Sequence, residues 1–306
     1  MKYTNKILVP VDFKKESLAA LKFAVKVARS IEAKIVMLYV IEEQGFFTSM
    51  VLSEEQRKMI HQKAVDKLMT LTKEEKSLAK ASIEIVTKEG KVYAKIVKTA
   101  LEIDAKFIIM GRTDSSDWKK NFTGTNTLHI IRESKIPVIT VRNDKHLADN
   151  HILLPLNLRK SVKEKVTKAI EIAHLLNAKI SLLTVLSTDL ISVELKVNER
   201  LYELEHIFNK FDIECTTKLI ESKEDMFKVI NNYAKEIAAE MVMIMTQHEL
   251  DFHDYIIGTN AQEIINKSEL PVISIIPNTI IEEEIDMSFF KHLFDPLEVY
   301  KTKKKS

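Results

Sequence analysis

Short apolar runs alternate with longer mixed segments along the first half of the chain. The apolar runs are rich in β-branched residues, a pattern typical of buried strands, and they cover residues 6–11, 34–40, 82–87, 107–110 and 137–141. In the mixed segments apolar residues recur at helical spacing, which predicts helices after the first strand and over residues 53–76, 92–101 and 125–133. Because continuously apolar strands alternate with helices, the sequence predicts a doubly wound α/β domain, a parallel sheet covered by helices on both faces.

The same pattern occurs twice. Residues 6–13 (KILVPVDF) align with residues 151–158 (HILLPLNL) at an offset of 145. Further on, residues 124–126 (GTN) align with 258–260 (GTN), and residues 136–141 (IPVITV) align with 270–275 (LPVISI), both at an offset of 134. Ordered matches at two constant offsets indicate an internal repeat. We therefore predict two homologous Rossmann-like domains, residues 1–142 and 150–277, each with a five-stranded parallel sheet between helices, followed by a C-terminal extension, residues 278–306.

Composition narrows the classes of function. The 306 residues carry 46 Lys and Arg against 44 Asp and Glu, a net charge of +2, so the chain lacks the basic excess typical of nucleic-acid binding. One cysteine excludes an internal disulfide and fits a reducing compartment. No apolar stretch approaches the roughly 18 residues of a membrane span. We expect a cytoplasmic protein that binds neither nucleic acid nor membrane.

Candidate ligand-binding residues follow from the predicted topology. The five glycines form neither a dinucleotide-binding nor a P-loop motif. In an open parallel sheet, however, ligands bind beyond the carboxyl ends of the strands, where the strand order reverses. In the first copy these positions, together with the start of the last helix, hold Pro10, Val11, Asp12, Val40, Gly111, Arg112, Asp114, Gly124, Thr125 and Asn126.

Two of these groups also have simpler structural interpretations. Asp12 can accept hydrogen bonds from a ribose or a base, or it can cap the helix that follows. Gly124 and Thr125 can hold a phosphate at a helix N-terminus, or they can simply begin that helix. The sequence alone leaves both choices open.

Several of these motifs carry a family resemblance. Residues 9–13 (VPVDF), Met110-Gly111, Gly124-Thr125 and Pro137-Val138 resemble the universal stress protein family, and the resemblance covers both halves. It implies binding of ATP or AMP through the pattern Gly-x2-Gly-x9-Gly-[Ser/Thr], with Mg²⁺ only alongside ATP. In the first copy Asp114 stands at the middle glycine, where a carboxylate repels phosphate.

The second copy departs further from the family pattern. Met245 and His248 stand where the first copy has Gly111 and Asp114, and only Gly258 and Thr259 keep the pattern. The resemblance therefore implies weak ATP or AMP binding in the first copy.

The sequence leaves more than one function open. The resemblance implies a stress-response protein that regulates or interacts with other proteins; the alternatives are a nucleotide-independent interaction protein with both pockets decayed and, ranked last, a slow ATPase. We expect no catalytic residues, because no nucleophile–base constellation can be named, and no metal site, because the sequence has no paired Cys or His spacing that suits zinc. The resemblance also implies that residues 137–141 and 271–275 meet across a pseudo-twofold axis as an intrachain pseudo-dimer, with a homodimer of chains left open.

Overall fold

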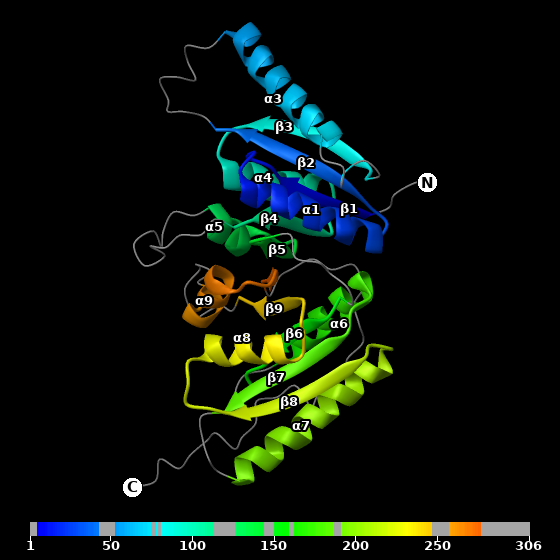
Figure 1. Ribbon diagram of the computed structural model, residues 1–306, viewed down its shortest axis with the longest axis vertical. Helices are drawn as coiled ribbons and strands as arrows, with labels where there is room; N and C mark the ends of the chain where they lie inside the picture. Colours follow the sequence, from blue (N-terminus) through cyan, green and yellow to red (C-terminus); the bar gives the residue numbers. More distant parts are fainter. Residues whose placement is uncertain are drawn as a thin grey trace. The chain divides into compact units, whose positions relative to one another are not determined.

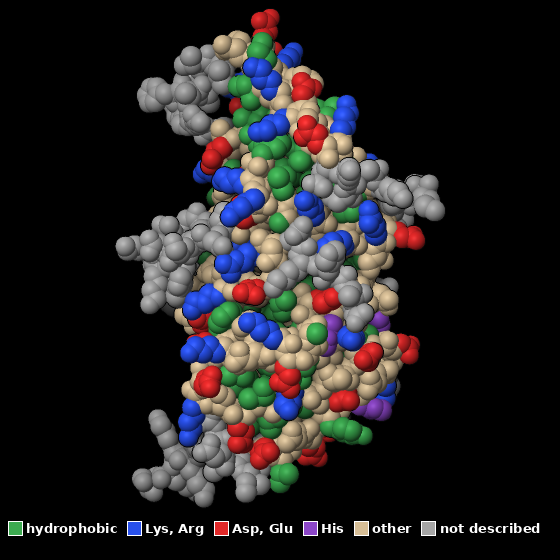
Figure 2. Space-filling view, viewed as in Figure 1, with side chains coloured by type: hydrophobic (Ala, Val, Ile, Leu, Met, Phe, Trp, Pro, Cys, Tyr) green, Lys and Arg blue, Asp and Glu red, His purple; other side chains and the backbone are tan. Residues whose placement is uncertain are grey.

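The computed structural model describes residues 5–42, 53–74, 78, 81–112, 126–143, 150–158, 162–186, 191–246 and 257–276. These residues belong to two compact units, which are described separately. No helix in the described part of the chain is long and apolar enough to span a membrane. On the face shown in Figure 2, Lys and Arg side chains are interspersed with Asp and Glu side chains, as the balanced composition predicts.

The first unit contains a five-stranded parallel sheet (Figure 1). Its strands are β1 (Asn5–Pro10), β2 (Ala33–Ile41), β3 (Ile83–Glu89), β4 (Phe107–Gly111) and β5 (Val138–Val141), and its helices are α1 (Lys15–Ser30), α3 (Glu54–Glu74), α4 (Val92–Glu102) and α5 (Asn126–Glu133). The strands lie in the order β3-β2-β1-β4-β5, with every neighbouring pair parallel. The doubly wound α/β layer expected from the sequence is confirmed.

The apolar runs form the core of this unit because helices cover both faces of the sheet. Ile7, Leu8 and Val9 of β1 are completely buried, as are Phe107, Ile108 and Ile109 of β4. Right-handed crossovers place α1 and α3 on one face and α4 and α5 on the other, and α4 packs against α5. The helix α3 lies along the edge strand β3 (Figure 1).

The second unit repeats the arrangement. Its elements are β6 (Ile152–Pro155), α6 (Lys163–Leu176), β7 (Ile180–Leu186), α7 (Ile191–Lys210), β8 (Cys215–Glu221), α8 (Met226–Glu236) and β9 (Met241–Met245). The strands run parallel in the order β9-β6-β7-β8, which matches β4-β1-β2-β3 of the first unit. Individual hydrogen bonds repeat as well, since the Nδ2 of Asn5 donates to the carbonyl of Ile31 and the Nδ2 of Asn150 to that of Leu176, both at 2.8 Å.

The final strand of the chain pairs with the final strand of the first copy. The strand β10 (Val272–Ile275), which follows α9 (Thr259–Lys267), is antiparallel to β5, with Ile273 opposite Ile139. These strands lie within the segments 137–141 and 271–275 that were expected to meet, and both belong to the first unit. The domain boundaries at 142, 150 and 277 stay a prediction, and the extension 278–306 lies outside the described residues.

Candidate functional site

The carboxylate of Asp12 lies at the carboxyl end of β1 and is fixed by the turn that leads into α1. Its Oδ1 accepts a hydrogen bond from the backbone N–H of Lys14 at 3.1 Å, and its Oδ2 lies 3.2 Å from the Nζ of Lys14. The Oγ of Ser17 accepts from the backbone N–H of Asp12 at 3.3 Å. The residue that caps α1 is Lys14, with no side-chain cap hydrogen bond. Asp12 therefore closes an Asx turn ahead of the helix and is not its N-cap.

This carboxylate stays ionised at neutral pH. Partial burial acts to raise the pKa of Asp12, but hydrogen bonding with Ser17 and Lys14 and the positive charge of Lys14 outweigh it, so the pKa lies below its ordinary value. A partly exposed, ionised carboxylate can accept hydrogen bonds from a ligand beyond those that it already receives.

An aromatic pair with a cation lies beside Asp12, and sequence reasoning did not single it out. Phe13, with a left-handed backbone (φ 64°), lies against Tyr39 of β2, with 5.2 Å between the ring centroids. The Nζ of Lys67 on α3 lies 4.0 Å from the centroid of the Phe13 ring. Val40 follows Tyr39 in β2, and Pro10 and Val11 precede Asp12, with Val11 buried. Phe13 and Tyr39 directly neighbour Asp12 and Val40 in the sequence, and this position beside the strand-end candidates is the signal that could have identified them.

Gly111 at the end of β4 is required by the packing of α1. A methyl group at this position would lie 2.3 Å from the carbonyl carbon and oxygen of Glu16 and 2.6 Å from the nitrogen of Ser17. A side chain here would meet helix backbone, which cannot turn aside as a side chain can. Packing is therefore a sufficient reason for glycine at this position.

The other candidates of the first copy separate into two groups. Asp114, Gly124 and Thr125 lie outside the described residues, and Asn126 is the exposed first residue of α5. Arg112 is buried, its backbone N–H donates to the carbonyl of Val141 at 2.9 Å, and its Nη2 donates to the carbonyl of Ser268.

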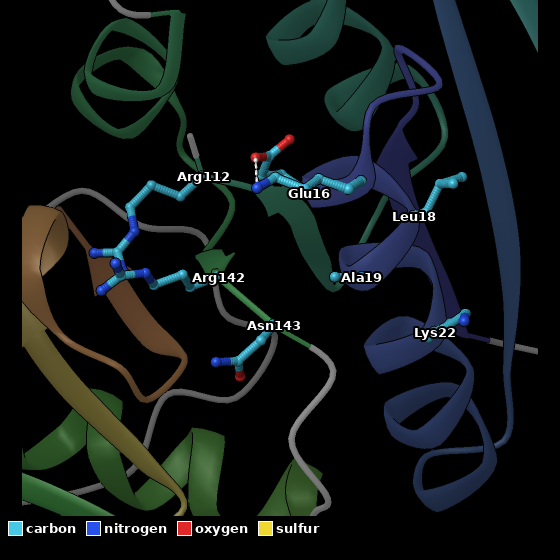
Figure 3. A pocket seen from close by; sticks show the side chains of 8 residues that line it. Glu16, Leu18, Ala19, Lys22, Arg112, Arg142 and Asn143 are labelled. Atoms are coloured by element: carbon cyan, nitrogen blue, oxygen red, sulfur yellow. Dashed lines mark ion pairs between the residues drawn. The ribbon is translucent and has the colours of Figure 1, made fainter. Parts of the chain in front are cut away.

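The Arg112 side chain lines a pocket beside α1 (Figure 3). The pocket has a volume of about 360 Å³ and is lined by Lys15, Glu16, Leu18, Ala19, Lys22, Arg112, Arg142 and Asn143. Asp12 and Val40 are not among these residues, so the structure does not bring the Arg112 side chain together with them in this pocket.

The equivalent positions of the second copy carry different chemistry. Asn157 is exposed after β6, in the place of Asp12. Met245 is buried at the end of β9, in the place of Gly111. Thr259 begins α9, as expected, while His248 lies outside the described residues. In the part of the chain that the structure describes, no group of three His, Cys, Asp or Glu side chains lies close enough together to hold a metal ion.

Comparison with known proteins finds similarity over both halves. The family model described as the Universal stress protein family matches residues 4–142 and 150–275. A universal stress protein of Methanocaldococcus jannaschii is 28% identical over 148 residues, which cover 46% of this chain and 84% of that protein.

Two solved structures from Archaeoglobus fulgidus are also similar. The crystal structure of a universal stress protein has a TM-score of 0.67 at 18% identity and covers 89% of this chain and 96% of its own. A universal stress protein in complex with dAMP covers 42% of this chain and 99% of its own, at 20% identity and a TM-score of 0.35.

Proposed function

Because the chain belongs to the universal stress protein family, we propose that its first copy binds an adenine nucleotide, ATP or AMP, and that occupancy changes its affinity for a protein partner in a stress response. The observation that carries this proposal is the Asp12 carboxylate, which is ionised and fixed at the carboxyl end of β1. The partner and the regulatory effect follow from the family resemblance alone.

The topology around Asp12 supports a ligand at this position. The strand β1 lies between β2 and β4, and the chain leaves β1 toward one side and returns on the other. A crevice is expected at the carboxyl end of such a switch point. Asp12, Val40 and Gly111 lie at or just beyond the ends of these three strands, so an adenosine placed here meets Asp12 as an acceptor for its ribose hydroxyls or its amino group.

We expect the affinity to be low. Asp114 replaces a glycine that the family pattern places beside the phosphates, and its charge repels them. We therefore expect a dissociation constant of roughly 10 µM or weaker. Magnesium is expected only as the partner of ATP, and no residue is assigned to hold it.

A second candidate is a nucleotide-independent interaction protein. The observation in its favour is Gly111, since the contact with the backbone of Glu16 and Ser17 accounts for this glycine without any ligand. A slow ATPase has no comparable support, because the sequence names no catalytic base.

Reciprocal exchange between the copies tests the nucleotide proposal. Asp12→Asn gives the first copy the residue of the second, and Asn157→Asp does the reverse as a matched control. We expect native mass spectrometry of the protein with ATP or AMP added at about 100 µM to show a bound adenine nucleotide, since this concentration exceeds a dissociation constant of about 10 µM. Titration calorimetry should show that Asp12→Asn weakens ATP, AMP and adenosine by about tenfold or more, the loss of one charged hydrogen bond, while Asn157→Asp leaves their affinities unchanged.

Two results would count against the proposal. Binding of all three ligands to folded Asp12→Asn with wild-type affinity would remove Asp12 from the site. Absence of binding by the wild-type protein in both calorimetry and mass spectrometry would favour the nucleotide-independent candidate.

A further inference from the structure

A basic pocket lies on the α1 face of the first unit, and the nucleotide proposal does not use it. It is the pocket described above, lined by the first turns of α1 and by Arg112, Arg142 and Asn143, which follow β4 and β5. We call it the arginine pocket. All of its residues belong to the first unit.

The fold itself brings the two arginines together. Gly111 and Val141 are register partners on the neighbouring parallel strands β4 and β5. Arg112 and Arg142 come directly after them, so both side chains leave the same end of the sheet. Figure 3 shows their guanidinium groups lying next to each other, on the side of the arginine stems that faces away from Glu16 and Ala19 of α1.

One of these guanidinium groups is held in place by the protein. Arg112 is only 4% exposed, and its Nη2 donates to the carbonyl of Ser268. Its backbone N–H is fixed to Val141 by a 2.9 Å hydrogen bond. A charged group that is already ordered loses little conformational entropy when a ligand arrives, which favours binding.

The charge of the lining points to an anionic ligand, and one buried acceptor points to a ligand that also carries a hydrogen-bond donor. Among the described residues, four cationic side chains line the pocket against a single carboxylate, Glu16, which lies 3.7 Å from the Nζ of Lys15. The Oδ1 of Asn143 is a buried acceptor without a hydrogen-bond partner among the described residues. An acceptor in this position favours a ligand that also brings a hydroxyl donor.

We propose that the arginine pocket binds a phosphate-bearing small molecule at a site separate from the adenosine crevice. Planar guanidinium groups bind phosphate oxygens in pairs, and lysine adds a point charge. A protonated phosphate oxygen or a ligand hydroxyl donates to Asn143. The volume of about 360 Å³ exceeds that of a single phosphate ion and suits a diphosphate or a small phosphorylated compound.

Titration of the full chain with pyrophosphate tests this site. We expect saturable binding that weakens as salt is added, because the attraction is between charges. Arg142→Gln should weaken it by about tenfold or more, since one charged contact is lost. Arg29→Gln is the matched control, because Arg29 is an exposed arginine at the far end of α1. If Arg142→Gln fails to fold, Lys22→Gln tests the same pocket from the helix side.

Further titrations separate this site from the nucleotide crevice. Pyrophosphate affinity that is unchanged in Asp114→Gly supports two sites, because this substitution acts on phosphates bound in the nucleotide crevice. Pyrophosphate binding that strengthens in Asp114→Gly as ATP binding does would place the ligand in the crevice and overturn the proposal. Absence of saturable binding, or equal weakening in Arg29→Gln, would overturn it as well.

Discussion

Replacing Gly111 with alanine separates a packing role for this glycine from a role in holding phosphate. The added methyl group would lie 2.3 Å from the Glu16 carbonyl, whereas real contacts of this kind start near 3.0 Å. The neighbouring atoms belong to the backbone of α1, so the first turn of the helix must withdraw from β4 by about 0.7 Å or more.

The free-energy cost of this displacement can be estimated from overpacking substitutions in protein cores. Forcing an extra methyl group into well-packed surroundings destabilises the folded state by about 1–3 kcal/mol. Alanine also lowers the conformational entropy of the unfolded chain, which stabilises the folded state by about 0.4–1 kcal/mol. We therefore expect Gly111→Ala to lower the free energy of unfolding by about 1.3 kcal/mol, which lowers Tm by roughly 3–5 °C for a unit of this size. Differential scanning calorimetry and urea unfolding both measure the loss.

The chain offers a matched control at Gly258. A methyl group there would meet no atom of the described residues within 4 Å, and the Gly258 backbone is not in the left-handed region. Gly258→Ala should therefore change the free energy of unfolding by less than about 1 kcal/mol. A Gly111→Ala protein with wild-type Tm and reduced ATP affinity would refute the packing argument and assign Gly111 to the ligand.

Three further outcomes are expected. Burial, assisted by Lys179, lowers the pKa of His151 below 6.5, so the folded state binds fewer protons than the unfolded state, and the free energy of unfolding should fall as the pH drops below about 6.5. The urea midpoint of His151→Asn should depend less steeply on pH than that of the wild type. An unchanged pH dependence would contradict this prediction. Burial, assisted by Glu205, raises the pKa of the Cys215 thiol, so a thiol reagent should modify the native protein far more slowly than the unfolded protein, and rapid native labelling would argue against this. Asp114→Gly should strengthen ATP binding by about tenfold and adenosine binding by less, whereas tight ATP binding by the wild type would show that Asp114 does not repel the phosphates.

Most of the fold could be predicted because strands buried on both faces of a parallel sheet appear in the sequence as short, continuous apolar runs. The run Ile7 to Val11 is apolar without alternation, and such a run fits only a strand buried on both faces or a buried helix. Its Pro10 and its length favour a strand, and β1 ends at Pro10. The repeat then predicted the second unit, whose strand order copies the first.

The candidate site could be predicted only in part, because spacing fixes backbone positions better than side-chain directions. Asp12 was found because it ends a strand at the switch point. The Arg112 side chain turns to Ser268, which is 156 residues away in the sequence, and no local pattern indicates such a contact. Arg142 was missed because the same rule, residues that follow a strand, was applied to β4 and not to β5.

The two copies show which residues serve the fold and which allow the units to differ. Ser134 donates to the carbonyl of Ile136 at 2.7 Å, and Ser268 donates to that of Leu270 at 3.0 Å, so this turn before the last strand is built alike in both copies. At the strand ends the chemistry differs. Where the first copy has Arg112, the second has Thr246, whose Oγ1 donates to the carbonyl of Ile275 at 3.1 Å. Like the exchange of Asp12 for Asn157, this replaces a charged side chain by a neutral one, so anionic and adenosine ligands are expected to distinguish the copies although their sheets share one strand order.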